Sequence, residues 1–290
     1  MKATPNFFII GAPKAGSTSL WDGLRKHPDV FMPEPKEPKF FTRRIDAEGW
    51  GGYHSLFEKG KDKKARGEAT ADYSQVWAHP EVPERISHHV PEARLIYIVR
   101  HPLRRVESAW KKEVMLGRLP DDTFRDAVRN YRPIVEDTRY FRNLDAYRDH
   151  FPDDQIQVVF LEDLAAHPLR VLKACDEFLG VDPSARSADD RGSRKNASSG
   201  NRTKGPLLDK LGGTQGWRVL KHVLPLPVRN FVRKNVLMKP LPTPEWDSQT
   251  RQWVIEQTQD DVAKILAYAG KPPDYWNVTK GEERTRSSSW

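Results

Sequence analysis

The residues best suited to chemistry begin in the stretch FFIIGAPKAGSTSL, residues 7–20. Lys14 can supply a positive charge, and Ser17, Thr18 and Ser19 can supply hydroxyl and backbone N–H donors. The order of apolar run, glycine loop and helix start places these donors at a helix N-terminus, where the helix dipole also favours an anion. We therefore interpret the loop as an anion site. The alternative is a plain strand-to-helix turn whose glycines serve only close packing.

The loop is close to the nucleotide-binding P-loop pattern G-x-x-x-x-G-K-[ST] but differs from it at the lysine. Gly11 and Gly16 have the spacing of that pattern, and Thr18 stands at its Ser/Thr position. Ser17 occupies the lysine position, and the lysine lies earlier, at Lys14. A hydroxyl can donate a hydrogen bond to a phosphate but carries no charge. We therefore favour a P-loop relative that handles another anion, with a metal-dependent P-loop kinase as the alternative.

A second candidate anion site follows another apolar run, residues 94–99. Arg100 comes directly after this run, and Ser108 lies about two helical turns further on. An arginine offers a charged, planar fork that suits phosphate oxygens, and a serine adds a hydroxyl. Taken singly, Arg100 could form a surface ion pair and Ser108 could be an ordinary helix residue.

Hydrophobic patterns predict the elements that position these residues. Strands are expected at 6–10, 66–73, 94–99 and 156–161, and helices at 17–27, 82–90, 103–116, 122–130, 139–150, 168–179 and 248–269. Strands that alternate with helices predict a parallel sheet with right-handed crossovers. Ligands bind beyond the carboxyl ends of such strands, so the glycine loop and Arg100 can converge on one ligand.

Composition limits the classes of protein that this chain can belong to. The 290 residues suffice for one large core, so we expect one domain over 1–276 and a disordered tail over 277–290. The net charge of +8 suits an anionic cofactor or an acidic substrate. The basic residues are scattered and no DNA- or RNA-reading motif stands out, so nucleic acid is not the expected partner.

The chain carries one cysteine, Cys175, which excludes an intrachain disulfide and suits a reducing compartment. No apolar run approaches the length of a membrane span or of a signal-peptide core. These features predict a soluble, cytoplasmic protein without stable membrane insertion. Residues 183–205 are expected to form a polar, basic surface loop with almost nothing to bury, and residues 217–239 a pair of peripheral basic helices. A membrane-surface or acidic-substrate role for 217–239 is the minority alternative.

Three stretches together resemble the sulfotransferases that use 3′-phosphoadenosine 5′-phosphosulfate (PAPS). Pro13–Ser19 is similar to that family's loop for the 5′-phosphosulfate. Arg100–Pro102, with Arg105 and Ser108, is similar to its 3′-phosphate element. Lys36–Phe41 is similar to the K-E-x-x-F-F segment of its carbohydrate-type branch and of many bacterial relatives. The order and spacing of all three agree.

The resemblance implies an α/β fold: a P-loop-like three-layer arrangement with a central parallel sheet flanked by helices. It also implies in-line transfer of a sulfuryl group from PAPS to an acceptor hydroxyl, with adenosine 3′,5′-bisphosphate (PAP) as the product and no metal. Lys14 would stabilise the leaving oxygen, and Glu37 would be the general base with Glu68 as its rival. The implied contacts to the donor nucleotide come from Lys14, Ala15, Gly16, Ser17, Thr18, Ser19, Arg100 and Ser108.

Two departures from the family pattern leave the acceptor open. Relatives with E-x-H-F-F carry a histidine where Lys39 stands, and relatives with E-K-T-P carry a lysine where Ala69 stands. Both positions line the acceptor side in those relatives, so a small molecule, a glycan or a lipid can be the acceptor. A nucleotide- or polyanion-binding module without catalysis is the non-enzyme alternative. The oligomeric state is also left open.

Overall fold

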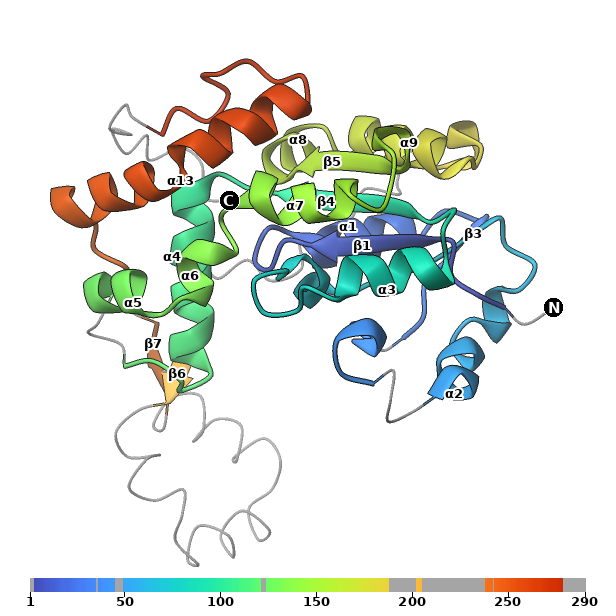
Figure 1. Ribbon diagram of the computed structural model, residues 1–290, viewed down its shortest axis with the longest axis horizontal. Helices are drawn as coiled ribbons and strands as arrows, with labels where there is room; N and C mark the ends of the chain where they lie inside the picture. Colours follow the sequence, from blue (N-terminus) through green and yellow to red (C-terminus); the bar gives the residue numbers. More distant parts are fainter. Residues whose placement is uncertain are drawn as a thin grey trace, which may run out of the picture.

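The computed structural model describes residues 3–34, 36–44, 49–120, 124–187, 202–204, 238–241 and 243–278. Its centre is a five-stranded parallel sheet with the strand order β2-β3-β1-β4-β5 (Figure 1). The strands are β1 (Phe7–Gly11), β2 (Val30–Phe31), β3 (Ala65–Ala69), β4 (Arg94–Val99) and β5 (Ile156–Phe160). The predicted parallel sheet is confirmed.

Helices lie between and beyond the strands. They are α1 (Ser17–Leu24), α2 (Gly49–Ser55), α3 (Val82–His89), α4 (Pro102–Met115), α5 (Phe124–Asn130), α6 (Pro133–Glu136), α7 (Tyr140–Arg148), α8 (Leu161–Ala166), α9 (Pro168–Leu179) and α13 (Ser248–Tyr268). A separate antiparallel pair joins β6 (Arg202–Lys204) to β7 (Met238–Pro240). In the described part of the chain, no helix is long and apolar enough to cross a bilayer.

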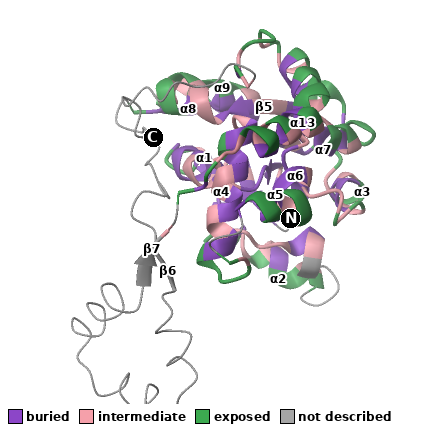
Figure 2. Cartoon of the chain, turned by 90° about the vertical axis from the view of Figure 1, so that its left-hand side faces the viewer, coloured by how far each residue is buried: buried purple, intermediate pink, exposed green. Residues whose placement is uncertain are grey.

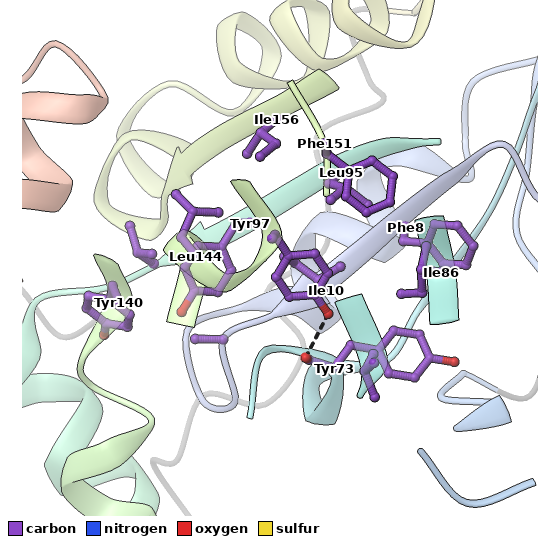
Figure 3. Close-up of a cluster of buried hydrophobic side chains, with 14 of the residues drawn as sticks. Phe8, Ile10, Tyr73, Ile86, Leu95, Tyr97, Tyr140, Leu144, Phe151 and Ile156 are labelled. Carbon is purple, nitrogen blue, oxygen red and sulfur yellow. Dashed lines mark hydrogen bonds between the residues drawn. The ribbon is translucent and has the colours of Figure 1, made fainter. Parts of the chain in front are cut away.

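The side chains of the sheet alternate between two hydrophobic clusters, one on each face. One cluster takes Phe8, Ile10, Leu95 and Tyr97, and α3, α7 and α13 complete it (Figure 3). The other takes Phe7, Ile9, Ile96 and Ile98 and is completed by α1, α8 and α9. Helices therefore cover both faces, which confirms the three-layer α/β fold. Figure 2 shows the buried positions on the inner sides of these helices.

A third hydrophobic cluster lies beyond the carboxyl end of β4. It joins α4, α5 and α6 to Val254 of α13, with Trp110 of α4 packed edge-on against Phe124 of α5. The long helix α13 thus packs against both α7 and α4 (Figure 1). This packing anchors α4, the helix that directly follows Arg100.

The chain path places a topological switch point beside the glycine loop. From β1 the chain crosses to β2 and β3 on one side of β1, and then continues to β4 and β5 on the other side. The connections after β1 and β4 therefore leave adjacent strands in different directions. Such a switch point in a parallel sheet is where ligands bind.

The structure corrects the ends of three predicted elements. The strand predicted over 66–73 stops at Ala69, because Tyr73 N turns back to bond the Thr70 carbonyl and forms a 3₁₀ turn, Ala71–Ser74. Helix α1 stops at Leu24 rather than residue 27. The strand predicted over 156–161 stops at Phe160, where α8 begins.

The segment 183–205 is also corrected where the structure describes it. Arg186 is buried rather than solvated, and its guanidinium forms two hydrogen bonds, 2.7 and 2.6 Å long, to the Asp176 carboxylate. Residues 202–204 form β6 rather than loop. Residues 188–201 and 205 lie outside the described residues. So do the peripheral helices predicted within 217–239, except for Met238 and Lys239 of β7, and most of the predicted tail.

Candidate functional site

Two glycines shape the loop between β1 and α1. A Cβ atom on Gly11, whose φ is 149°, would lie 2.0 Å from Ser74 Oγ. A Cβ atom on Gly16, whose φ is 103°, would lie 2.5 Å from Leu161 Cδ1. Only glycine fits at either position, and the turn ends at Ser17, the first residue of α1. The first N–H groups of a helix lack acceptors within the helix, so this terminus can bind an anion.

Cations gather beside this loop. Burial, followed by the positive charges of Lys112, Arg100 and Arg105, lowers the pKa of Lys14 to about 8. Within the described part of the chain, neither Lys14 nor Lys112 forms an ion pair. Positive groups that repel one another in a partly buried place are stabilised by an anion bound between them. The cluster therefore supports the predicted anion site.

Arg100 meets the loop at the carboxyl end of β4. Its Nη1 lies 3.5 Å from the Lys14 carbonyl oxygen, so the structure brings the two predicted anion-binding residues together. Tyr140 Oη donates a 2.7 Å hydrogen bond to the Arg100 carbonyl, and His101 N donates one of 2.9 Å to Glu162 Oε1. These contacts hold the backbone on both sides of the Arg100 carbonyl. Burial lowers the pKa of Arg100, but a guanidinium keeps its charge at neutral pH.

Ser108 and Lys112 continue this site along α4. Ser108 is half-buried, and Lys112 lies four residues later on the same face of the helix. Lys112 was not predicted as a site residue, although its spacing from Ser108 indicates it. A lysine one turn beyond a predicted anion-binding serine is a further candidate for the same site.

Glu37 lies between two lysines close to the start of α1. Lys36 Nζ donates to Glu37 Oε1 at 3.0 Å and to Ser17 Oγ at 3.3 Å. Lys39 Nζ lies 3.6 Å from Glu37 Oε2 and donates at 2.6 Å to Asp72 Oδ2. The Glu37 side chain is 34% exposed, so an acceptor can reach its carboxylate. The predicted base thus lies next to the anion loop, joined to it through Lys36.

The backbone around Glu37 is held in a conformation that non-glycine residues seldom adopt. The φ angles of Glu37 and Lys39 are 64° and 59°. Lys39 N donates to Thr70 Oγ1 at 3.3 Å, and Phe41 N donates to Tyr73 Oη at 3.2 Å. These bonds tie the segment to the residues just after β3. Left-handed backbone held in this way is common at functional sites.

Glu68, the rival base, is enclosed. Its side chain is 1% exposed, and its carboxylate accepts hydrogen bonds from Tyr53 Oη at 2.5 Å, Thr70 Oγ1 at 2.7 Å and Tyr73 Oη at 2.9 Å. Burial raises the pKa of Glu68, while these donors oppose the rise. An acceptor cannot reach this carboxylate. We conclude that Glu68 organises the residues behind Glu37.

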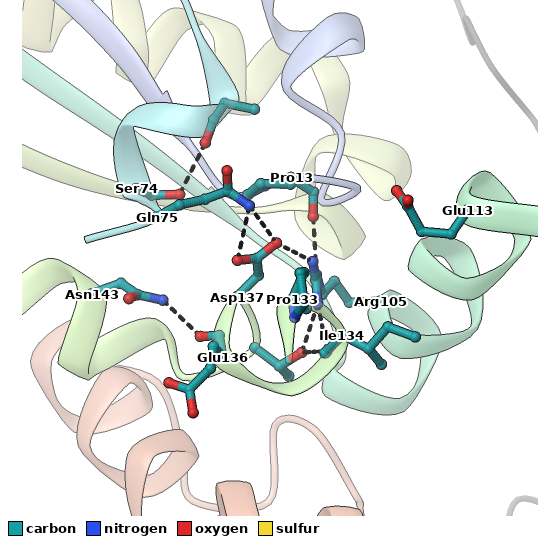
Figure 4. Close-up of polar contacts among 12 residues, drawn as sticks. Pro13, Ser74, Gln75, Arg105, Glu113, Pro133, Ile134, Glu136, Asp137 and Asn143 are labelled. Atoms are coloured by element: carbon teal, nitrogen blue, oxygen red, sulfur yellow. Dashed lines mark hydrogen bonds and ion pairs between the residues drawn. The ribbon is translucent and has the colours of Figure 1, made fainter. Parts of the chain in front are cut away.

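Arg105, which the resemblance groups with the 3′-phosphate element, is bonded to the protein itself. Its side chain is buried, and it donates through Nε to the Pro13 carbonyl at 3.0 Å, through Nη1 to the Ile134 carbonyl at 2.6 Å and through Nη2 to Asp137 Oδ2 at 2.7 Å (Figure 4). Asp137 also accepts from Gln75 Nε2 at 3.0 Å. Arg105 therefore positions the anion loop, and its guanidinium donates to protein acceptors rather than to a ligand.

In the part of the chain that the structure describes, no three His, Cys, Asp or Glu side chains gather in a group that could hold a metal ion. Lys14, Lys112, Arg100 and Arg105 supply positive charge around the loop.

The comparison with known protein families identifies this arrangement. Residues 4–206 match the model of a family described as the sulfotransferase domain. The chain belongs to the sulfotransferase family. This confirms the resemblance carried by the glycine loop, the arginine after β4 and the K-E-x-x-F-F segment.

Curated relatives agree with this assignment. Human heparan sulfate glucosamine 3-O-sulfotransferase 3B1 is 32% identical over 190 residues, which cover 62% of this chain and 47% of that protein. The bifunctional heparan sulfate N-deacetylase/N-sulfotransferase 1 of Caenorhabditis briggsae is 26% identical over 204 residues, covering 62% of this chain and 23% of that protein. The chain thus matches about half the length of the first relative and less of the second.

Solved structures share the fold. A sulfotransferase from Alicyclobacillus acidocaldarius superposes with a TM-score of 0.66 at 21% identity, covering 95% of this chain and 99% of that one. Mouse sulfotransferase SULT7A1, solved in complex with PAP, superposes with a TM-score of 0.50 at 15% identity, covering 90% of this chain and 85% of that one. At these identities the likeness shows the fold alone.

Proposed function

We propose that the protein transfers the sulfuryl group of PAPS to a hydroxyl group of a glycan acceptor. The observation that carries this proposal is the meeting of Lys14 and Arg100 at the ends of adjacent strands, with Glu37 beside them. A ligand with two separate anionic groups suits two adjoining cationic sites. PAPS has this property, since it carries a phosphosulfate at the 5′ position and a phosphate at the 3′ position.

The donor substrate is held by the two predicted elements in this proposal. The backbone of the loop 14–19, the hydroxyls of Ser17 and Thr18, and the Lys14 ammonium bind the 5′-phosphosulfate. Arg100 and Ser108 bind the 3′-phosphate. The mouse structure in complex with PAP supports a PAPS-type donor for this fold.

The chemical step is an in-line displacement at sulfur. The acceptor oxygen forms a bond to sulfur while the bond between sulfur and the 5′-phosphate oxygen breaks. Glu37 takes the proton of the acceptor hydroxyl, because its carboxylate is exposed whereas that of Glu68 is enclosed. Lys14 stabilises the negative charge that develops on the leaving oxygen. In this scheme the cations of the protein do the work that a metal ion does in a kinase.

The acceptor class rests on the curated relatives. The human and nematode proteins named above are, by name, heparan sulfate sulfotransferases. We extend from them only the broader class, a glycan hydroxyl. The lysine at position 39 in place of the family's histidine points to a different choice of acceptor within that class.

The test is PAPS-dependent turnover against a panel of acceptors, read by mass. The panel contains glycans, lipids with free hydroxyls, phenols and amines. We expect a gain of one sulfuryl group on a glycan, release of PAP, and loss of both in Lys14→Met. Transfer to another acceptor class would overturn the glycan proposal alone. Failure with every acceptor, together with phosphoryl transfer from ATP and magnesium, would favour the kinase alternative.

A further inference from the structure

Lys36 lies beside the proposed base but has no role in the reaction described above. Its ammonium lies 3.3 Å from Ser17 Oγ and 3.0 Å from Glu37 Oε1, and its side chain is only 14% exposed. Among the contacts that the structure describes, Lys36 is the one side chain that bonds both to the first residue of α1 and to the proposed base. An anion bound at the start of α1 would lie within reach of this ammonium.

Lys36 and Lys14 have different neighbours near the start of α1. The charges that act most on Lys14 are those of Lys112 and Arg100, which lie on α4 and at the end of β4. The contacts of Lys36 are instead Ser17 and Glu37. One lysine thus belongs to the nucleotide side of the loop, and the other belongs to the side where the acceptor must approach the base.

We propose that Lys36 is a direct ligand of the sulfuryl group, and that donor binding draws its ammonium away from Glu37 and so releases the base. The inference rests on the proposed function. Before the donor binds, Lys36 occupies Glu37 Oε1. When the donor binds, the ammonium donates to the sulfuryl oxygens, and Glu37 Oε1 becomes free to take the acceptor proton.

The two side chains differ in mobility in a way that allows this exchange. An ammonium has three N–H donors on a flexible stem, so it can turn toward a new acceptor without moving the backbone. Glu37, in contrast, is held by a left-handed backbone that Lys39 and Thr70 fix in place. During transfer the sulfuryl oxygens lie between the attacking and leaving oxygens, and the Lys36 ammonium bound to them stabilises their negative charge. Bond making and breaking stay as described above, with the proton passing from acceptor to Glu37.

The test compares two ligands that differ only in the sulfuryl group. Calorimetry without acceptor measures the affinities of PAPS and PAP for wild-type protein, Lys36→Met and Lys36→Arg. Lys173→Met is the matched control, because it removes the same charge from an exposed position on α9. Thermal unfolding of each variant shows whether it folds as the wild type does.

We expect Lys36→Met to lose roughly 10- to 100-fold in affinity for PAPS, the usual effect of removing a charged hydrogen bond, while PAP affinity changes by less than about twofold. Lys36→Arg should keep most of the PAPS affinity, and Lys173→Met should behave as wild type. Equal losses for PAPS and PAP, or no loss for either, would overturn the assignment of Lys36. Wild-type protein that binds neither nucleotide would instead overturn the proposed function.

The release of Glu37 from Lys36 can be tested separately through nucleotide affinity. In free protein Glu37 competes for Lys36, so Glu37→Gln should strengthen PAPS binding more than PAP binding. In the double variant Lys36→Met/Glu37→Gln this gain should vanish, which a double-mutant cycle measures. A gain that persists without Lys36 would show that Glu37 acts on the donor by simple charge repulsion, and would overturn the exchange.

Discussion

The behaviour of Lys14 illustrates how the surroundings of one residue set its chemistry. A lysine in water titrates far above neutral pH, but burial and the charges of Lys112, Arg100 and Arg105 lower the pKa of Lys14 to about 8. The sequence predicted that Lys14 binds an anion. It could not predict this shift, because the residues that cause it are brought together only by folding.

The lowered pKa predicts a pH dependence. In the proposed reaction the charged form of Lys14 binds the donor, and that form is lost as pH rises through about 8. PAP affinity should therefore fall by about tenfold between pH 7 and pH 9, since one unit above the pKa leaves about a tenth of the lysine charged. Lys14→Met should bind PAP weakly and show a flat profile over this range. A wild-type profile that is equally flat would contradict the role given to Lys14.

Glu37 and Glu68 make a matched pair of carboxylates for testing the base. Glu37→Gln keeps the shape of the side chain and should lower the transfer rate by about two to four orders of magnitude. Raising the pH should partly rescue this variant with a phenol acceptor but not with a sugar. Glu68→Gln should mainly lower thermal stability, because three hydroxyl donors lose their shared carboxylate. A normal rate in Glu37→Gln beside a collapse in Glu68→Gln would reverse the two roles.

At the scale of elements, periodicity predicted the architecture well. The apolar runs at 94–99 and 156–161 became β4 and β5, and the glycine loop leads into α1 as expected. The strand ends were harder to predict, since the turn at Ala71–Ser74 depends on hydrogen bonds formed after Thr70 leaves the ladder. Helix α6 was missed because four residues are too few to show a helical period.

Arg105 shows why an element's side chains are less predictable than its backbone. The resemblance includes Arg105 in the 3′-phosphate element without giving it a contact, and the five donors of its guanidinium serve the fold instead. In the structure it links α4 to Pro13, Ile134 and Asp137, so it joins three segments that are distant in sequence (Figure 4). Burial raises the pKa of Asp137, and Arg105 opposes that rise.

This network predicts a stability effect that differs from a ligand effect. Arg105→Met leaves Asp137 buried without its cation and should lower the free energy of unfolding by about 3–5 kcal/mol. Arg105→Met/Asp137→Asn removes both charges and should recover part of that loss. Chemical denaturation of the single and double variants measures both. An Arg105→Met protein as stable as wild type, with only PAP binding impaired, would return Arg105 to the 3′-phosphate site.

At the scale of the whole molecule, the site is assembled by the sheet from segments far apart in the chain. The order β2-β3-β1-β4-β5 sets the ends of β1 and β4 side by side. The C-terminal region also takes part, because Trp276 Nε1 donates at 3.2 Å to Glu162 Oε2, and the other oxygen of Glu162 accepts from His101 N. The sequence does not show that Trp276 reaches the segment beside Arg100, because this contact depends on the tertiary fold.

The central claim is that these segments hold one nucleotide through two phosphates. Calorimetry of PAP and of adenosine 5′-monophosphate, both in the presence of a chelator, tests it without an acceptor. We expect wild-type protein to bind PAP at least tenfold more tightly than the monophosphate, and Arg100→Ala to lose that preference while keeping its affinity for the monophosphate. Equal loss of both nucleotides in Arg100→Ala, or binding that requires added magnesium, would contradict the account.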